Sequence, residues 1–179
     1  GTPEGGSGAG GYVPNQALVM FRASDEPLTK SQAIRALSTG SHGIGVVADM
    51  EIGDLDISDA EMVILPGGLG GVASICACAE AMEAIRFAWE NGKFVAAICA
   101  GPTVLADLGI TDGKNATCYP GCEGGMGKAL VHSDVAAVMD GRLITGASAG
   151  CAIPFGLKLI EALKGEEEAQ RIAKQIVIR

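Results

Sequence analysis

The stretch that decides the fold is FVAAICAGP, residues 94–102. An apolar, β-branched run stops at Cys99, and two small residues and a proline precede a helical pattern over residues 103–108. This order is typical of a strand, a tight turn and a helix, with Cys99 on the turn. Such a turn projects its side chain from the carboxyl end of the sheet, where open α/β folds bind their ligands.

Cys99 is the first candidate for a nucleophile. The helix that follows would place its N-terminal turn beside the sulfur, and the positive end of the helix dipole favours thiolate over thiol. The small neighbours Ala100 and Gly101 leave room for a substrate. The alternative is a packed core thiol, because cysteine is among the most buried residue types. The strand–turn–helix pattern alone leaves both interpretations open.

The composition of the 179-residue chain favours a single, tightly wound α/β domain. It contains 48% hydrophobic residues, 27 glycines and only 4% aromatic residues. The net charge of −8 argues against nucleic acid or an anionic membrane surface as a partner. We interpret the six cysteines as reduced thiols of a cytoplasmic protein, since the chain is not cysteine-dense. Neither a signal peptide nor a membrane-spanning helix is expected.

Two parts of the chain are expected to differ in order. Residues 1–14 are rich in glycine and offer almost nothing to bury, which is typical of a flexible leader. Residues 15–179 should form one domain, in which strands alternate with helices. Such alternation predicts a mostly parallel sheet with helices on both faces. Strands are predicted over residues 17–21, 43–49, 61–65, 94–98, 116–119, 135–139 and 142–145, and helices over residues 30–38, 79–91, 103–108, 151–163 and 166–174.

A glycine-rich turn, LPGG at residues 65–68, follows a buried strand and precedes a helix. Glycines let the backbone approach a ligand closely, and N–H groups there can stabilise an oxyanion. A tight turn with glycines for geometry alone is equally compatible with this tetrapeptide. GLGGVA at residues 68–73 also fits a dinucleotide fingerprint. However, the next strand ends in Ile98-Cys99 and not in a ribose-binding acid, so nucleotide binding is the weaker interpretation.

The segment CYPGC, residues 118–122, spaces two thiols by three residues. Metal sites usually need four ligands, and His42 and His132 show no ligand spacing to this pair, so neither a metal nor another cofactor is expected. Tyr119 is a candidate site residue, because a phenol at a strand end can donate a hydrogen bond to a substrate. A packed aromatic ring with a satisfied hydroxyl is the alternative.

Four motifs occur in one order: TGSHGI at residues 39–44, LPGG at 65–68, AAICAGP at 96–102 and ATCYPG at 116–121. In this combination the chain resembles the ThiJ/PfpI family, in particular the Parkinson-disease protein deglycase branch of the class I glutamine amidotransferase-like superfamily. The resemblance covers the chain from about residue 38 to its end. It implies a flavodoxin-like three-layer α/β sandwich with a mostly parallel sheet, usually in a homodimer.

The same resemblance implies roles for particular residues. It marks Cys99 as the reactive cysteine, Gly67 or Gly68 together with Ala100 as the oxyanion site, and Tyr119 as a residue near the pocket. Protease-like members of the family carry histidine directly after the cysteine. Ala100 stands at that position here, which argues against a peptidase triad.

The family also carries an acidic residue that hydrogen-bonds the cysteine from the loop after the first strand. Glu26 is our candidate for this group, with Asp25 second, because these are the only acids in the expected loop. Residues 146–151 read GASAGC where many relatives have Ser-Arg-Gly-Pro, so the pocket lacks that arginine and should bind anions less well.

The resemblance implies a cysteine-dependent enzyme acting on small reactive carbonyls. The reaction would be a glyoxalase-like conversion of methylglyoxal to lactate, or the related deglycation, with a small carbonyl compound as the partner. A second class of function is a non-enzymatic redox sensor or chaperone whose Cys99 is oxidised. Both classes need the same activated thiol, so the sequence leaves them open.

Overall fold

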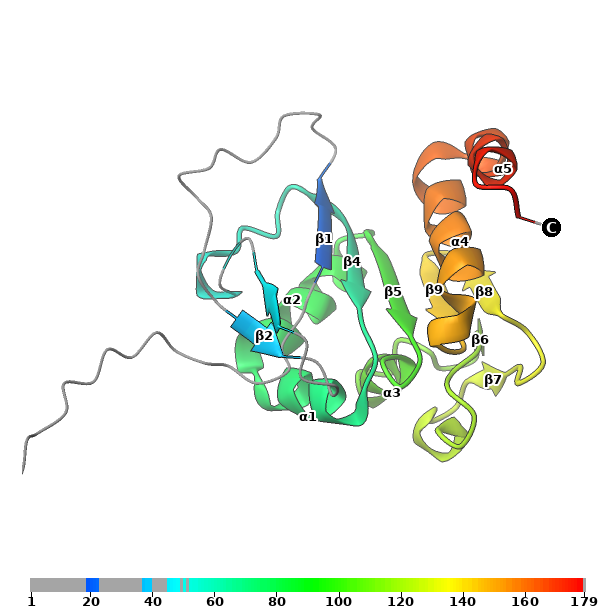
Figure 1. Ribbon diagram of the computed structural model, residues 1–179. Coiled ribbons are helices and arrows are strands. Elements are labelled where there is room, and N and C mark those ends of the chain that lie inside the picture. The colour runs from blue at the N-terminus through cyan, green and yellow to red at the C-terminus, as the bar shows by residue number, and fades with distance from the viewer. Residues whose placement is uncertain (1–18, 23–36, 40–44, 49, 51, 179) are drawn as a thin grey trace, which may run out of the picture.

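The computed structural model describes residues 19–22, 37–39, 45–48, 50 and 52–178. Its centre is a five-stranded sheet in the order β1-β4-β5-β9-β8 (Figure 1). Three inner strands run parallel, whereas β1 and β8 pair antiparallel at the two edges. The strand bounds are β1 Val19–Arg22, β4 Ala60–Leu65, β5 Phe94–Ile98, β8 Ala137–Asp140 and β9 Leu143–Gly146.

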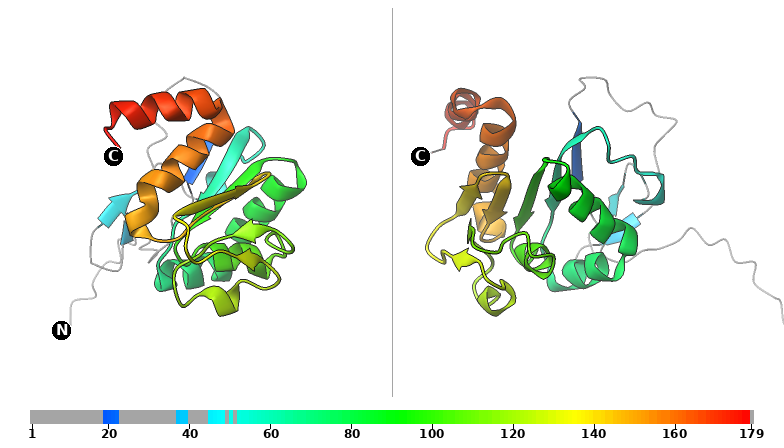
Figure 2. Two further views of the ribbon diagram at one scale, coloured as in Figure 1. Left: turned by 90° about the vertical axis from the view of Figure 1, so that its right-hand side faces the viewer. Right: turned by 180° about the vertical axis from the view of Figure 1, so that it is seen from behind.

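Helices cover both faces of this sheet and make three layers, as Figure 2 shows. Helices α1 (Leu69–Ala77), α2 (Ala79–Glu90) and α3 (Pro102–Asp107) lie on one face, and α4 (Ala152–Lys164) lies on the other. Helix α5 (Glu166–Gln175) packs on α4. The expected layered α/β arrangement is thus found.

The alternation of side chains along the inner strands explains this layering. Successive residues of a strand point to opposite faces. Val63 and Val95 therefore belong to the core beneath α1, α2 and α3, whereas Met62 and Ala96 pack with Phe155 of α4. All four strand residues are fully buried, as expected of parallel strands covered on both sides.

Helix α2 follows from the spacing of its apolar residues. Ala81, Ala84, Ile85 and Ala88 are buried, and their separations of three and four residues place them on one helix face. The helix ends before Gly92, whose φ of 76° is the left-handed conformation that glycine adopts at helix ends. The chain then turns directly into β5, the strand that carries the cysteine motif.

Smaller elements lie around the main sheet. Strands β2 (Leu37–Thr39) and β3 (Gly45–Val47) form an antiparallel pair, and β6 (Asn115–Ala116) and β7 (Leu130–Val131) form a parallel pair. Three short 3-10 helices are η2 Ile52–Asp54, η3 Glu123–Gly125 and η4 Ala149–Cys151. None of the helices within the described ranges is long and apolar enough to span a membrane.

Two expectations for local structure were wrong. The end of the helix predicted over residues 30–38 falls in β2, and its earlier residues lie outside the described part of the chain. The strand predicted over residues 116–119 ends at Ala116. Beyond it, the N–H of Thr117 donates to the side-chain hydroxyl of Thr145, and the N–H of Tyr119 donates to the carbonyl of Cys99 on the elbow. The proposed leader, residues 1–14, also lies outside the described residues.

Candidate functional site

Cys99 occupies a strained turn between β5 and α3. Its φ is 64°, and among the described residues only Val177 shares a positive φ without being glycine. The left-handed conformation costs a side-chain-bearing residue about 1 kcal/mol, and such strain persists only where the surroundings enforce it. β4 and β9 run parallel to β5 and end beside it, so the turn lies at the carboxyl edge of the sheet. This geometry is the elbow that the sequence predicts.

Hydrogen bonds fix the backbone of Cys99 on both sides. Its N–H donates to the carbonyl of Gly146 at 2.9 Å, and its carbonyl accepts the N–H of Tyr119 at 2.8 Å. The N–H of Gly101 donates to the carbonyl of Ile98 at 3.0 Å and closes the turn. Both backbone polar groups of Cys99 are therefore paired, and the direction of its side chain is set by its surroundings.

The two glycine motifs of the sequence pack against each other at this turn. A Cβ atom on Gly67 would lie 2.5 Å from the Cys99 Cβ and 3.1 Å from its Sγ. A Cβ atom on Gly101 would lie 2.9 Å from the carbonyl oxygen of Pro66. Real Cβ atoms do not approach other atoms so closely, so both positions require glycine. Gly67 is thus in contact with the thiol.

The predicted oxyanion residues lie around the same turn. Gly68, with a φ of 87°, precedes the first residue of α1, and Ala100 directly follows the cysteine and is buried. Within the described part of the chain, neither N–H donates a hydrogen bond. Amides that keep their donor capacity next to a nucleophile are suited to bind a developing oxyanion. The assignment of these residues to an oxyanion site remains a prediction.

Tyr119 is joined to the elbow through its backbone and has an exposed side chain. Its N–H bonds to Cys99, and 47% of its surface is accessible. The preceding segment is held by a bond of 2.9 Å from the Thr117 N–H to the Thr145 hydroxyl. The predicted carboxylates Glu26 and Asp25 lie outside the described residues.

Three of the other thiols resist ionisation. Burial raises the pKa of Cys118 to about 11, and the charges of Glu123 and Cys122 add to the effect. Burial also raises the pKa of Cys122, with further contributions from the charges of Cys99 and Glu123. The Cys76 side chain is exposed, yet the surrounding protein removes part of its water, and this desolvation together with the charge of Asp107 raises its pKa. A raised pKa lowers the fraction of thiolate at neutral pH, which makes these three side chains weaker nucleophiles.

The alternative nucleotide site gains no support from its surroundings. The first glycine of the fingerprint, Gly68, precedes α1, and the next strand ends at the Cys99 elbow, where a ribose would require an acid. In the described ranges, no group of three or more histidine, cysteine or acidic residues is arranged to hold a metal ion.

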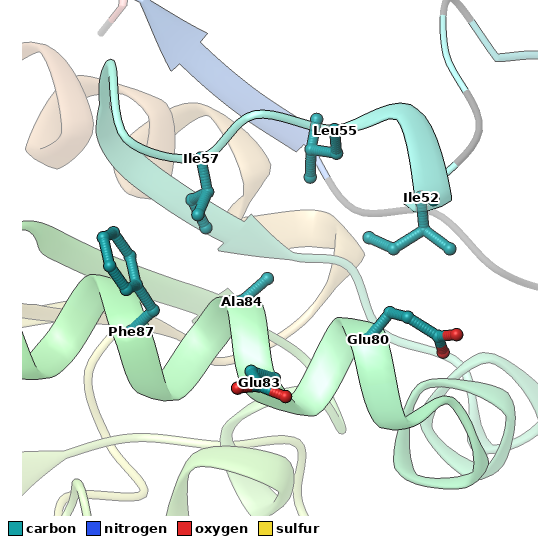
Figure 3. A pocket seen from close by; sticks show the side chains of 8 residues that line it. Ile52, Leu55, Ile57, Glu80, Glu83, Ala84 and Phe87 are labelled. Atoms are coloured by element: carbon teal, nitrogen blue, oxygen red, sulfur yellow. The ribbon is translucent and has the colours of Figure 1, made fainter.

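A groove of about 300 Å³ lies apart from the elbow. Figure 3 shows it between α2 and the loop that leads into β4, with Ile52, Leu55 and Ile57 on one wall. Glu80 and Glu83 project from α2 along the other wall. None of its lining residues belongs to the cysteine site.

The chain matches the DJ-1/PfpI family over residues 15–162. This chain belongs to the DJ-1/PfpI family. Protein dj-1beta of Drosophila melanogaster is 35% identical over 143 residues, covering 77% of this chain and 74% of that protein. Its crystal structure matches with a TM-score of 0.74 and 33% identity over 80% of this chain and 77% of that chain. The expected family and fold are confirmed.

Two further relatives bear the names of enzymes. A glutathione-independent glyoxalase of Caenorhabditis elegans is 30% identical over 137 residues, covering 76% of this chain and 73% of that protein. A deglycase of Pyrococcus abyssi is 29% identical over 131 residues, covering 73% of this chain and 78% of that protein. The chain spans only 40% and 45% of two Arabidopsis thaliana DJ-1 homologues that it also matches.

Sequence spacing does not identify Cys122 as a neighbour of Cys99, because it pairs Cys122 with Cys118. A signal was present, because Tyr119-Pro120-Gly121-Cys122 has the Pro-Gly order of a type II turn. The structure has the corresponding bond of 2.9 Å from the Cys122 N–H to the Tyr119 carbonyl, and a φ of 97° at Gly121.

Proposed function

We propose that this protein is a cysteine-dependent enzyme that acts on small reactive carbonyl compounds. The substrate class is α-oxoaldehydes such as methylglyoxal, converted to the hydroxy acid lactate, or the related adducts removed by deglycation. The observation that carries the proposal is the Cys99 elbow, strained at a φ of 64° and in contact with Gly67. The relatives named glyoxalase and deglycase support it at the level of the family.

The first step is attack of the Cys99 thiolate on the aldehyde carbon. A carbon–sulfur bond forms, and the carbonyl electron pair moves to oxygen, giving a hemithioacetal alkoxide. The N–H groups of Gly68 and Ala100 would bind this alkoxide. Preorganised donors of this kind stabilise the transition state more than the neutral carbonyl, because the charge develops during the attack.

Proton transfers complete the reaction without an external oxidant or reductant. A carboxylate, for which Glu26 is our candidate, takes the proton from the former aldehyde carbon and returns it to the neighbouring ketone carbon. The first carbon is thereby oxidised to a thioester and the second is reduced to an alcohol. Water then hydrolyses the thioester, which releases lactate and regenerates the thiol. Tyr119 is proposed to orient the substrate by hydrogen bonding.

Turnover of methylglyoxal by the purified full chain tests this function. We expect lactate to accumulate without glutathione, and Cys99→Ser to reduce the rate to that of the buffer. Cys76→Ser is the matched control, because Cys76 lies on α1 and is exposed. The absence of lactate formation by the unmodified protein, or its retention in Cys99→Ser, would refute the proposed reaction. No turnover combined with ready peroxide oxidation of Cys99 would favour the redox-sensor function.

A further inference from the structure

A second thiol is tied to the candidate nucleophile by a short hydrogen-bonded path. The carbonyl of Cys99 accepts the N–H of Tyr119 at 2.8 Å, and the carbonyl of Tyr119 accepts the N–H of Cys122 at 2.9 Å. Two consecutive backbone hydrogen bonds thus connect Cys99 and Cys122, which are far apart in the sequence. The Pro120-Gly121 turn folds Cys122 back toward the elbow.

The direction of the Cys122 pKa shift agrees with this backbone geometry. A negative charge on Cys99 raises the pKa of Cys122, in addition to the larger effect of burial. Because such an effect weakens with distance, it is in keeping with the two hydrogen bonds that hold the Cys122 turn on the elbow. Both side chains are half-buried, which leaves each of them partly open to solvent.

We propose that Cys122 is the resolving thiol of Cys99, so that a hydroperoxide converts this pair into an intramolecular disulfide. The inference rests on the proposed reactivity of Cys99 and adds a redox control of the same site. The disulfide would remove the nucleophile reversibly. It would also prevent further oxidation of Cys99 to the irreversible sulfinic and sulfonic acids.

The chemistry balances with a hydroperoxide as the only oxidant. The Cys99 thiolate attacks the peroxide oxygen, the O–O bond breaks, and an alcohol or water leaves after protonation, which gives a sulfenic acid. The Cys122 thiolate then attacks the Cys99 sulfur, the S–OH bond breaks, and the hydroxide takes up a proton to leave as water. Two electrons pass from the two thiols to the peroxide.

The charge interaction gives this pair an order of events. Burial makes the largest contribution to the raised pKa of Cys122, and a negative charge on Cys99 adds to it. Sulfenic acid is neutral at the same position, so oxidation of Cys99 removes that contribution. The fraction of Cys122 thiolate therefore rises once there is an electrophilic sulfur for it to attack.

Cys118 is the nearby thiol that the structure disfavours for this role. It is 3% exposed and packs in the main core with Met126 and Ala116. Its pKa is raised to about 11, chiefly by burial. Cys122 instead lies in a turn whose residues Pro120 and Gly121 are exposed, so the turn has room to adjust to disulfide geometry.

Peptide mapping after peroxide treatment tests the proposal. The reduced full chain is exposed to increasing hydrogen peroxide at pH 7, alkylated, and digested with trypsin without reduction. Cleavage after Lys93, Lys114 and Lys128 separates a peptide with Cys99 from one that holds Cys118 and Cys122. We expect the two peptides to become linked within one chain, with a loss of two of the six free thiols.

Two matched variants assign the partner. Cys122→Ser should abolish the link and direct Cys99 to sulfinic acid, a gain of two oxygen atoms, whereas Cys118→Ser should retain the link. The proposal is overturned if the link persists in Cys122→Ser. It is also overturned if Cys99 of the unmodified protein gains oxygen while Cys122 can still be alkylated. If the unmodified protein still converts methylglyoxal in that second case, the proposed function is not affected. Cys99 that reacts with neither peroxide nor carbonyl refutes both.

Discussion

Replacing Gly67 with alanine should destabilise the protein, because the new methyl group has no space. Its Cβ would lie 2.5 Å from the Cys99 Cβ and 2.9 Å from the Ile98 carbonyl oxygen. Ordinary contact begins near 3.4 Å, so two backbone segments must separate by close to 1 Å. Overpacking of this kind costs about 1–3 kcal/mol, and we expect about 2 kcal/mol for Gly67→Ala.

The assay is unfolding by urea and by heat. A loss of about 2 kcal/mol corresponds to a decrease in Tm of roughly 4–8 °C for a domain of this size. Gly156→Ala is the matched control, because a Cβ there meets no atom within 4 Å and the residue lies inside α4. The free energy of unfolding of Gly156→Ala should be higher by about 0.5–1 kcal/mol, because alanine has the better helix propensity. If Gly67→Ala is as stable as the unmodified protein, the tight contact with Cys99 does not exist.

Two further predictions concern pH. The pKa of Cys118 is raised in the folded state to about 11, so the unfolded chain loses this proton at a lower pH than the folded one. The free energy of unfolding should therefore decline as the pH rises from about 8.5 toward 11, by at most about 1.4 kcal/mol per pH unit. Urea unfolding of Cys118→Ala should lack this contribution, and identical pH profiles for the two proteins would contradict it. The pKa of Asp140 is lowered chiefly by the hydrogen bond of 2.8 Å that its carboxylate accepts from the Asn115 N–H. The stabilisation of the fold by this carboxylate is therefore present above about pH 4 and is lost as the pH falls through the lowered pKa. Asp140→Ala should cost about 1 kcal/mol at pH 7 and less at pH 3, whereas a pH-independent cost would exclude the carboxylate as its source.

The elbow could be predicted because its signals are local. An apolar strand that ends in Cys-Ala-Gly-Pro specifies a turn within a few residues. The Asp140-Gly141 dipeptide between β8 and β9 is a local signal of the same kind, because Asp-Gly is a preferred hairpin turn. The β1 edge of the sheet was harder to predict. The antiparallel pairing of β1 with β4 depends on partners distant in sequence, and the four residues of β1 carry no sign of the direction in which the strand pairs.

The rest of the site depends on contacts that the sequence does not encode locally. Residues 117–119 have strand-like composition, yet the N–H of Thr117 donates to the Thr145 hydroxyl and that of Tyr119 to the Cys99 carbonyl, so tertiary contacts override the propensity. The interaction between Cys122 and Cys99 likewise arises only after the turn at Pro120 packs on the elbow. The contact of Gly67 with the thiol follows from the meeting of two glycine-rich turns, which pattern reasoning treats separately.

The most direct test of the central claim is a time course of alkylation by iodoacetamide at near-neutral pH, read by peptide mass spectrometry. We expect Cys99 to be modified before the other five cysteines, because it alone stands on the strained elbow. Three of the five, Cys118, Cys122 and Cys76, also have raised pKa values. If Cys99 stays protected while Cys118 or Cys122 reacts first, the elbow thiol is a packed core residue and the catalytic assignment is wrong.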